Sequence, residues 1–306
     1  MIFLVVPCYN EKEVLPSTNK RLKGLLKELP SSTHILYVDD GSTDDTWEII
    51  KGLSKEQENV DGLRLSHNVG QQAATWAGME ACINRKAKAI ISLDADLQDD
   101  IKVIPHMVKL WMEGADIVYG VRKGRRSDSF MKRFPALCFY KLMQHLGCNM
   151  VYNHSEFRLL SRRASEALLS YPERNLFVRG LLPMIGFNET TVFFDRQARK
   201  SGKTKYSWKK LMMLAMDGIT SFTVKPLHWI LALGGGFIFI SLCVIVWALR
   251  NFWTGMAVSG WTSLLVSLWF VSGCILLSIG IIGEYIGKVY IETKQRPRFF
   301  VMEKTF

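Results

Sequence analysis

The sequence has few cysteines and no arrangement of them that is typical of a metal site or a disulfide framework. Six cysteines occur among 306 residues, and no two are spaced as a CxxC pair. Such scattered cysteines are typical of reduced thiols in a cytosolic setting. No strand-to-helix turn carries GxGxxG or GxxxxGK[ST]. This absence disfavours dinucleotide binding and P-loop nucleotide binding.

Charge is missing from two long stretches. No charged side chain occurs over 226–249 or over 251–283. Each stretch exceeds the roughly 20 apolar residues that cross a bilayer core of about 30 Å. We therefore predict a two-helix transmembrane hairpin over 226–284, with helices near 229–249 and 261–283. A buried helical hairpin in a soluble core is the alternative.

Cations lie mainly outside this hairpin. The cations that flank its two ends are Lys209, Lys210, Lys225, Lys288, Lys294, Arg296 and Arg298. The turn that connects the two helices contains only one cation, Arg250. The positive-inside rule then predicts a multi-pass protein of the cell membrane, with the N-terminal domain and both termini in the cytoplasm. The net charge of +11 suits a membrane-facing protein that binds phosphates. Nucleic acid is the competing partner for a basic protein. No nucleic-acid-binding motif occurs, so we do not expect nucleic acid as a partner.

Short apolar strands alternate with helices before the uncharged stretches. The predicted strands are 2–6, 34–40, 63–66, 89–96 and 116–122. This alternation predicts an α/β domain over 1–207, with a mostly parallel sheet and helices on both faces.

Three of the predicted strand ends carry polar or acidic side chains. They are Pro7, Tyr9, Asn10 and Glu11 after the first strand, Asp39 and Asp40 at the second, and Asp94, Asp96 and Gln98 at the fourth. Because ligands of open α/β sheets bind at the carboxyl ends of the strands, we predict one common site there. Helix capping is the alternative for each acid alone, and it is the preferred interpretation for Asp44 and Asp99.

The motif DADLQDD at 94–100 predicts a divalent cation. Asp94, Asp96 and Gln98 can converge on Mg²⁺ or Mn²⁺ just past the strand. Such ions take carboxylate and amide oxygens and keep positions open for substrate phosphates. The cation would offset the mutual repulsion of the acids and bind a diphosphate, so the acids imply a nucleotide ligand.

Several motifs together resemble glycosyltransferase family 2, whose fold is the Rossmann-like GT-A fold. They are VVPCYNE at 5–11, VDDGSTDDT at 38–46, NVGQQAATWAG at 68–78 and DADLQDD at 94–100. Later stretches are similar to the membrane-anchored polyprenyl-phosphate glycosyltransferases, which include bactoprenol glucosyltransferases and, more distantly, dolichol-phosphate mannosyltransferase. These stretches are EFRLLSRR at 156–163, PERNLFVRGL at 172–181, SGKTKYS at 201–207, DGITSF at 217–222 and GEYIGKVYIETKQRPRF at 283–299. The resemblance covers essentially the whole chain.

The resemblance implies inverting transfer of a hexose, with glucose expected, from a UDP-sugar to undecaprenyl phosphate on the cytoplasmic leaflet. The product would serve O-antigen, cell-surface polysaccharide or cell-wall modification. The implied nucleotide-sugar contacts are Pro7, Tyr9, Glu11, Asp40 and Asp94, and the implied metal ligands are Asp94, Asp96 and Gln98. The sequence departs from the family where a pattern of Arg-Asn followed by Gly-Lys reads His67, Asn68, Gly70 and Gln71 here. This change removes two cations near the donor and leaves the sugar open.

The resemblance also implies that Asp96 and Glu156 are catalytic. A phosphate monoester is mostly ionised near neutral pH, because its second pKa is about 6. The acceptor therefore needs little help in losing a proton. For Glu156 four interpretations stay open: a general base, a positioning residue, a hydrogen-bond partner of a sugar hydroxyl, or a buried ion pair with Arg158.

Two basic segments, 121–134 and 195–206, are expected to bind the lipid phosphate. The predicted contacts are Arg122, Arg133, Arg196, Arg199 and Lys205. Apolar residues at helical spacing beside lysines predict helices that lie on membrane lipids at about 128–146 and at 208–225. Ordinary core helices are the alternative. Residues 285–306 are expected to form a basic cytoplasmic tail.

Three consecutive glycines at 234–236 favour close helix packing, and we expect a homo-oligomer. A separate flippase and a downstream transferase are expected as partners, since one hairpin offers a sugar no path across the membrane. Other functions stay open. They are transfer of N-acetylglucosamine, galactose, an arabinose-type sugar or mannose from GDP-mannose, a processive polysaccharide synthase, and a non-catalytic scaffold that binds nucleotide sugars. The single hairpin and the missing QxxRW motif disfavour a synthase, and the intact acids disfavour a scaffold.

Overall fold

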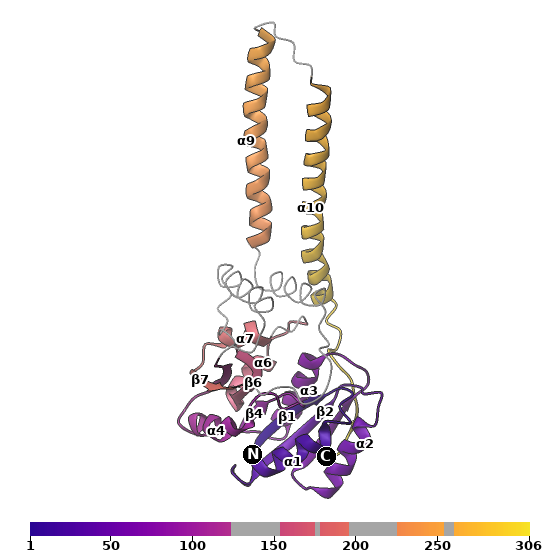
Figure 1. The fold of residues 1–306 in the computed structure, drawn as a ribbon, viewed down its shortest axis with the longest axis vertical. Coiled ribbons are helices and arrows are strands. Elements are labelled where there is room, and N and C mark those ends of the chain that lie inside the picture. The colour runs from indigo at the N-terminus through magenta and orange to yellow at the C-terminus, as the bar shows by residue number, and fades with distance from the viewer. Residues whose placement is uncertain (124–153, 175–177, 196–224, 254–259) are drawn as a thin grey trace. The chain divides into compact units, whose positions relative to one another are not determined.

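The computed structural model describes residues 1–123, 154–174, 178–195, 225–253 and 260–306 (Figure 1). These residues form two compact units. In its described residues, the first unit contains 1–123, 154–174, 178–195 and 296–306, and the second contains 225–253 and 260–295.

Among the described residues, eight strands form one mixed sheet in the order β7-β5-β6-β4-β1-β2-β3-β8. The strands are β1 (Ile2–Cys8), β2 (Thr33–Asp39), β3 (Val60–Leu65), β4 (Ala89–Ser92), β5 (Ile117–Arg122), β6 (His154–Ser161), β7 (Glu189–Phe194) and β8 (Val301–Lys304). The pairs among β4, β1, β2 and β3 are parallel, and so is the pair of β5 with β7. Strand β6 runs antiparallel to β4 and β5. The predicted α/β domain with a mostly parallel sheet is confirmed.

Helices connect these strands. They are α1 (Leu15–Leu26), α2 (Thr46–Glu56), α3 (Gln71–Asn84), the short 3-10 helix η1 (Ile101–Val103), α4 (Ile104–Met112), α6 (Arg162–Leu169) and α7 (Val178–Ile185). Every residue of β1 and β2 is buried or partly buried. Strands covered on both faces have nearly continuous apolar sequences, which is why these segments were readable as strands.

Helix α3 packs directly against the centre of the sheet. A Cβ atom built on Gly78 would lie 2.5 Å from Val5 Cγ1 and 2.8 Å from Val38 Cγ2. Both valines belong to the central strands β1 and β2, so only a residue without a side chain allows this approach. The close packing fixes α3, and with it the start of that helix at Gln71.

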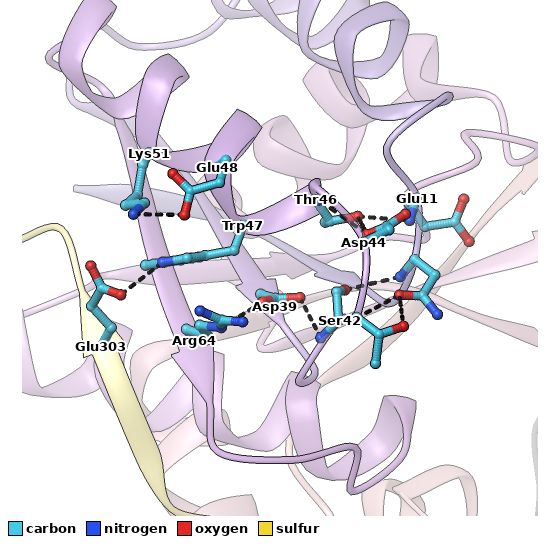
Figure 2. A network of polar contacts seen from close by, with 12 residues as sticks. Glu11, Asp39, Ser42, Asp44, Thr46, Trp47, Glu48, Lys51, Arg64 and Glu303 are labelled. Carbon is cyan, nitrogen blue, oxygen red and sulfur yellow. Dashed lines mark hydrogen bonds and ion pairs between the residues drawn. The ribbon is translucent and has the colours of Figure 1, made fainter.

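The end of the chain adds an edge strand to the first unit. Strand β8 pairs antiparallel with β3, with Arg64 opposite Glu303. Trp47 Nε1 in α2 donates a hydrogen bond of 2.8 Å to Glu303 Oε2 (Figure 2). The backbone N–H of Gly62 donates to Thr305 Oγ1 at 2.9 Å. The segment 285–306, expected to be a basic tail, therefore contains a strand of the sheet.

The second unit contains two long helices, α9 (Lys225–Trp253) and α10 (Trp261–Thr293). In the described part of the chain, one segment, Phe270–Thr293, is long and apolar enough to cross a membrane, and its most apolar 18-residue window has a mean hydropathy of 1.8. No residue of its most apolar window is buried, which disfavours a soluble core helix. In α9 the corresponding apolar segment is shorter, Leu227–Phe237. The two-helix transmembrane hairpin therefore stays a prediction.

The predicted interfacial helices lie outside the described residues, apart from the end of the second one, where α9 begins at Lys225.

Candidate active site

The loops after β1 and β2 are bound to each other by hydrogen bonds (Figure 2). The backbone N–H of Asn10 donates to Ser42 Oγ at 2.9 Å, and that of Glu11 donates to Thr46 Oγ1 at 3.0 Å. The predicted nucleotide contacts Tyr9 and Glu11 lie in the first of these loops, with Pro7 just before it in β1. Tyr9 is exposed. The two loops therefore form one rim at the carboxyl end of the sheet.

Asp39 and Asp40 are both buried at the end of β2. Asp39 accepts a hydrogen bond from the backbone N–H of Ser42 at 3.1 Å and forms an ion pair of 3.3 Å with Arg64 (Figure 2). Asp40 accepts the backbone N–H groups of Val69 at 2.8 Å and Gly70 at 3.0 Å. Asp40 thus holds the turn that leads into α3 next to the end of β2.

Gly41 occupies a position that other residues cannot adopt without strain. Its φ is +65°, and an added Cβ would lie 2.5 Å from the carbonyl carbon of His67. We expect Gly41→Ala to lower the free energy of unfolding by about 2 kcal/mol, which lowers the melting temperature by about 6 °C. Thermal unfolding of the purified protein measures this. The control is Gly52→Ala in α2, where an added Cβ meets nothing within 4 Å. Equal melting temperatures for the two variants would contradict the expectation.

Beyond β4 the chain turns so that several carboxylates gather. The backbone N–H of Leu97 donates to the Asp94 carbonyl at 3.2 Å, and Leu97 has a φ of +45°. Burial and then the nearby carboxylates of Asp99 and Asp96 raise the pKa of Asp94 to about 7. The charge of Glu156 acts in the same direction. The predicted carboxylates Asp94 and Asp96 are thus brought together with two further acids.

The start of α3 contacts this cluster. Gln71 Nε2 donates a hydrogen bond of 2.5 Å to Asp94 Oδ1. Gln71 stands where the family resemblance places a lysine, so a neutral amide contacts the carboxylate. The side chain of Asp94 is therefore oriented by a hydrogen bond without an added positive charge.

The acid cluster fits a divalent cation that substrate oxygens complete. Among the described residues, no three His, Cys, Asp or Glu side chains are arranged to hold a metal by themselves. Asp94 and Asp96 supply two carboxylates, and the backbone N–H of Gln98 donates to Asp96 Oδ1 at 3.2 Å. Burial, and then the charges of the neighbouring acids, raise the pKa of Asp94, and a bound cation would offset both effects. Two carboxylates with open positions are typical of Mg²⁺ sites that bind phosphates.

Glu156 in β6 lies between two arginines. It forms an ion pair with Arg158, and its Oε1 accepts a hydrogen bond of 2.9 Å from Arg179 Nε in α7. Burial alone would raise the pKa of Glu156, but the charges of Arg158 and Arg179 outweigh it and lower the pKa to about 2. Ser92 Oγ donates to the Glu156 carbonyl at 2.7 Å, which places Glu156 beside the end of β4. A carboxylate with this pKa is a weak proton acceptor.

Arg179 was not singled out by sequence analysis, although it lies in the quoted stretch PERNLFVRGL. Of the predicted phosphate contacts, Arg122 alone lies in the described part of the chain; Arg133, Arg196, Arg199 and Lys205 lie outside it. Arg122 ends β5, and its Nη2 lies 3.2 Å from Asp99 Oδ1. Its charge lowers the pKa of Asp94, so Arg122 also belongs to the site.

Comparison with known proteins shows the family of the chain. Residues 3–169 match the family described as Glycosyl transferase family 2, which is more than half of the chain. The chain therefore belongs to glycosyltransferase family 2, and the protein is a glycosyltransferase.

Two relatives cover almost the whole chain. The Bacillus subtilis glycosyltransferase YkoT is 45% identical over 307 residues, which span 98% of this chain and 91% of YkoT. The bactoprenol glucosyl transferase of Shigella phage SfV is 38% identical over 302 residues, which span 98% of this chain and 97% of that protein. The expected resemblance to bactoprenol glucosyltransferases is confirmed.

A solved structure is similar in fold. Glucosyl-3-phosphoglycerate synthase from Mycobacterium tuberculosis, in complex with Mn²⁺, UDP and phosphoglyceric acid, is 20% identical with a TM-score of 0.50. The match covers 72% of this chain and 76% of that one. This likeness supports the predicted GT-A fold.

Proposed function

We propose that the protein transfers a hexose, glucose, from a UDP-sugar to undecaprenyl phosphate with inversion. The observation that carries this proposal is the 38% identity to a bactoprenol glucosyl transferase over 98% of this chain. Bactoprenol is undecaprenol, so the name of that relative matches the proposed acceptor. The cluster of acids at the end of β4 supports the same reaction, because a divalent cation held there would stabilise UDP as the leaving group.

The donor nucleotide is proposed to bind at the rim formed by the loops after β1 and β2. Pro7, Tyr9, Glu11 and Asp40 would contact the uridine. The hydrogen bonds between these loops support this proposal, since they hold the residues in one place before a ligand arrives. The exposed ring of Tyr9 is available to stack on a base.

The diphosphate is proposed to bind beside Asp94, Asp96 and Gln98, which would hold Mg²⁺ or Mn²⁺. When bound, the cation neutralises the charge that develops on the departing UDP. The Gln71 amide orients the Asp94 carboxylate for this task. The similar structure with Mn²⁺ and UDP supports only the fold. The proposal of a bound cation therefore depends on the carboxylate and amide oxygens of this chain.

In the proposed reaction an oxygen of the lipid phosphate attacks the anomeric carbon of the sugar. The bond from that carbon to the UDP oxygen breaks, and the product is a β-linked polyprenyl monophosphate sugar. The acceptor is already mostly ionised near neutral pH. Glu156, with a pKa of about 2, is better suited to hold Arg158 and Arg179 in place than to accept a proton. We therefore propose that Asp96 and Glu156 contribute by charge and position, with Arg122 on the acceptor side.

The cell membrane is the proposed location, since the acceptor is a membrane lipid. The apolar helix segment Phe270–Thr293 supports membrane attachment. A second span in α9, helices lying on the lipid surface, cytoplasmic termini and a homo-oligomer belong to the same proposal. A separate flippase and a downstream transferase would carry the sugar to a wall polymer or an O-antigen.

A transfer assay with radiolabelled donors tests the proposed function. Purified membranes that contain the protein are incubated with labelled UDP-glucose and undecaprenyl phosphate, and the lipid fraction is extracted and counted. Label should enter the lipid, and undecaprenol without its phosphate should accept none. If the lipid is instead labelled only from UDP-N-acetylglucosamine, UDP-galactose or GDP-mannose, that result would replace UDP-glucose as the proposed donor but would leave the proposed type of reaction unchanged. No labelled lipid from any donor would leave a nucleotide-sugar-binding scaffold as the better account.

A further inference from the structure

Arg298 joins three separate segments of the first unit. The chain enters this unit from α10 at Arg296, so Arg298 lies at the very start of the returning segment. Its Nη2 donates hydrogen bonds to two backbone carbonyls, Tyr171 at 2.6 Å and Glu173 at 2.8 Å. Its guanidinium carbon lies 4.4 Å from the ring centroid of Trp76. A single side chain thus connects the C-terminal segment, the turn after α6 and helix α3.

The contacts of Arg298 with Trp76 and with the turn after α6 involve elements that carry residues of the candidate site. Trp76 is buried in α3, the helix that begins with Gln71 at Asp94. The turn that contains Tyr171 precedes α7, where Arg179 pairs with Glu156. The two elements also meet directly, because the backbone N–H of Val178 donates to Gln72 Oε1 at 3.4 Å.

From these contacts we propose that Arg298 is a positioning residue for the ion pair of Arg179 with Glu156, which we assign to the acceptor side of the site. It fixes the turn before α7 against α3 and so holds Arg179 at Glu156. An arginine suits this task, because its planar guanidinium can donate to carbonyls while its face stacks on an indole. A lysine can bond to a carbonyl but has no planar group to stack. The effect on the reaction rests on the proposed function, whereas the effect on α7 does not.

The rest of the C-terminal segment stays in place without Arg298. Glu303 bonds to Trp47, and Ser54 Oγ donates to Thr305 Oγ1 at 2.8 Å. The guanidinium of Arg85 lies 4.4 Å from the ring centroid of Phe306. Because β8 has these anchors of its own, a substitution at Arg298 should leave β8 paired and should act on the turn before α7 and its contact with α3.

Amide hydrogen exchange on the full-length protein tests the proposal independently of activity. In Arg298→Ala the amides of α7 should exchange about tenfold faster than in the wild type, and those of β1 and β2 should not change. Arg298→Lys should restore only part of the protection. The matched control is Arg296→Ala, an exposed arginine of the same segment, which should behave as the wild type does. Unchanged exchange in α7, or faster exchange throughout the first unit, would overturn the proposal.

Kinetics give the second readout. With kcat measured at saturating lipid phosphate, Arg298→Ala should lower kcat about tenfold while KM for the nucleotide sugar stays the same, because small displacements of reacting groups are costly. A rise in KM for the nucleotide sugar with kcat unchanged would count against a role on the acceptor side. A wild-type protein that transfers no sugar would refute the proposed function but leave the exchange result standing.

Discussion

Asp96→Asn is expected to lower sugar transfer about a thousandfold. Asp96 is one of the two carboxylates proposed to hold the cation, and a neutral amide oxygen in its place would bind the cation more weakly than a carboxylate does. The variant should remain folded, because Asp96 lies in a cluster of like charges and its loss relieves repulsion on Asp94. Labelled lipid formed per minute, together with the melting temperature, measures both effects.

Asp100→Asn is the matched control, since Asp100 belongs to the same motif. Its Oδ1 accepts the backbone N–H of Lys102 at 3.2 Å at the start of η1, and asparagine can replace it there. This variant should transfer sugar at close to the wild-type rate. Similar rates for the two variants, whether both high or both low, would remove the special role of Asp96.

Glu156→Gln should have the largest effect on stability. Arg158 is only 3% exposed and would keep a buried positive charge without its carboxylate partner. Removal of one partner of a buried ion pair costs about 3 kcal/mol or more. Because Arg179 also loses its anchor, transfer should fall at least about a hundredfold. Melting temperature and kcat measure the two effects.

The pH dependence separates the roles of Glu156. Its pKa is about 2 in the folded protein, below the usual carboxyl value, so the pair stabilises the fold above pH of about 4. This contribution is lost as the pH falls toward 2. If Glu156 were a general base, Glu156→Gln would recover transfer at higher pH. A positioning role instead predicts that this variant loses transfer by the same factor from pH 6 to about 9. Recovery of Glu156→Gln at high pH would contradict the positioning role.

Glu166→Gln is the control for stability. Glu166 forms an ion pair of 2.7 Å with Arg162, and both side chains are more than a third exposed. Exposed pairs of this kind contribute less than about 1 kcal/mol. If this variant lost as much stability as Glu156→Gln, burial of the Glu156 pair would not explain the effect.

The central sheet could be predicted because burial leaves a clear trace in the sequence. Strands β1 and β2 are covered on both faces, so their residues form apolar runs. Strand β8 left no such trace, because its four residues are all exposed and its partner β3 is distant in the chain. Its place depends on long-range contacts such as the bond between Trp47 and Glu303.

The site was predictable where strand ends alone position the residues. Asp94 and Asp96 lie just past the end of β4, and the charge of Asp96 acts on Asp94. Side-chain partners from other elements were harder to predict. Asp99 was expected to cap a helix, but it pairs with Arg122 from β5, and Asp100 caps η1 instead.

Arg179 shows the same limit. Its pairing with Glu156 depends on how α7 packs beside β6, and the spacing of the two residues in the sequence does not show this. The stretch that contains Arg179 was noted as a motif, which was the available signal. The contact of Asp44, in contrast, is local: Asp44 Oδ1 accepts the backbone N–H of Thr46 at 3.0 Å, although the N-cap position of α2 is Asp45 and not Asp44.

Calorimetric titration of the purified protein with UDP, with Mn²⁺ and then with EDTA, tests the role of the acid cluster most directly. We predict binding with Mn²⁺, a loss of most of that affinity with EDTA, and no difference between the two conditions in Asp96→Asn. Equally tight binding of UDP by the wild-type protein with and without the cation would contradict the account.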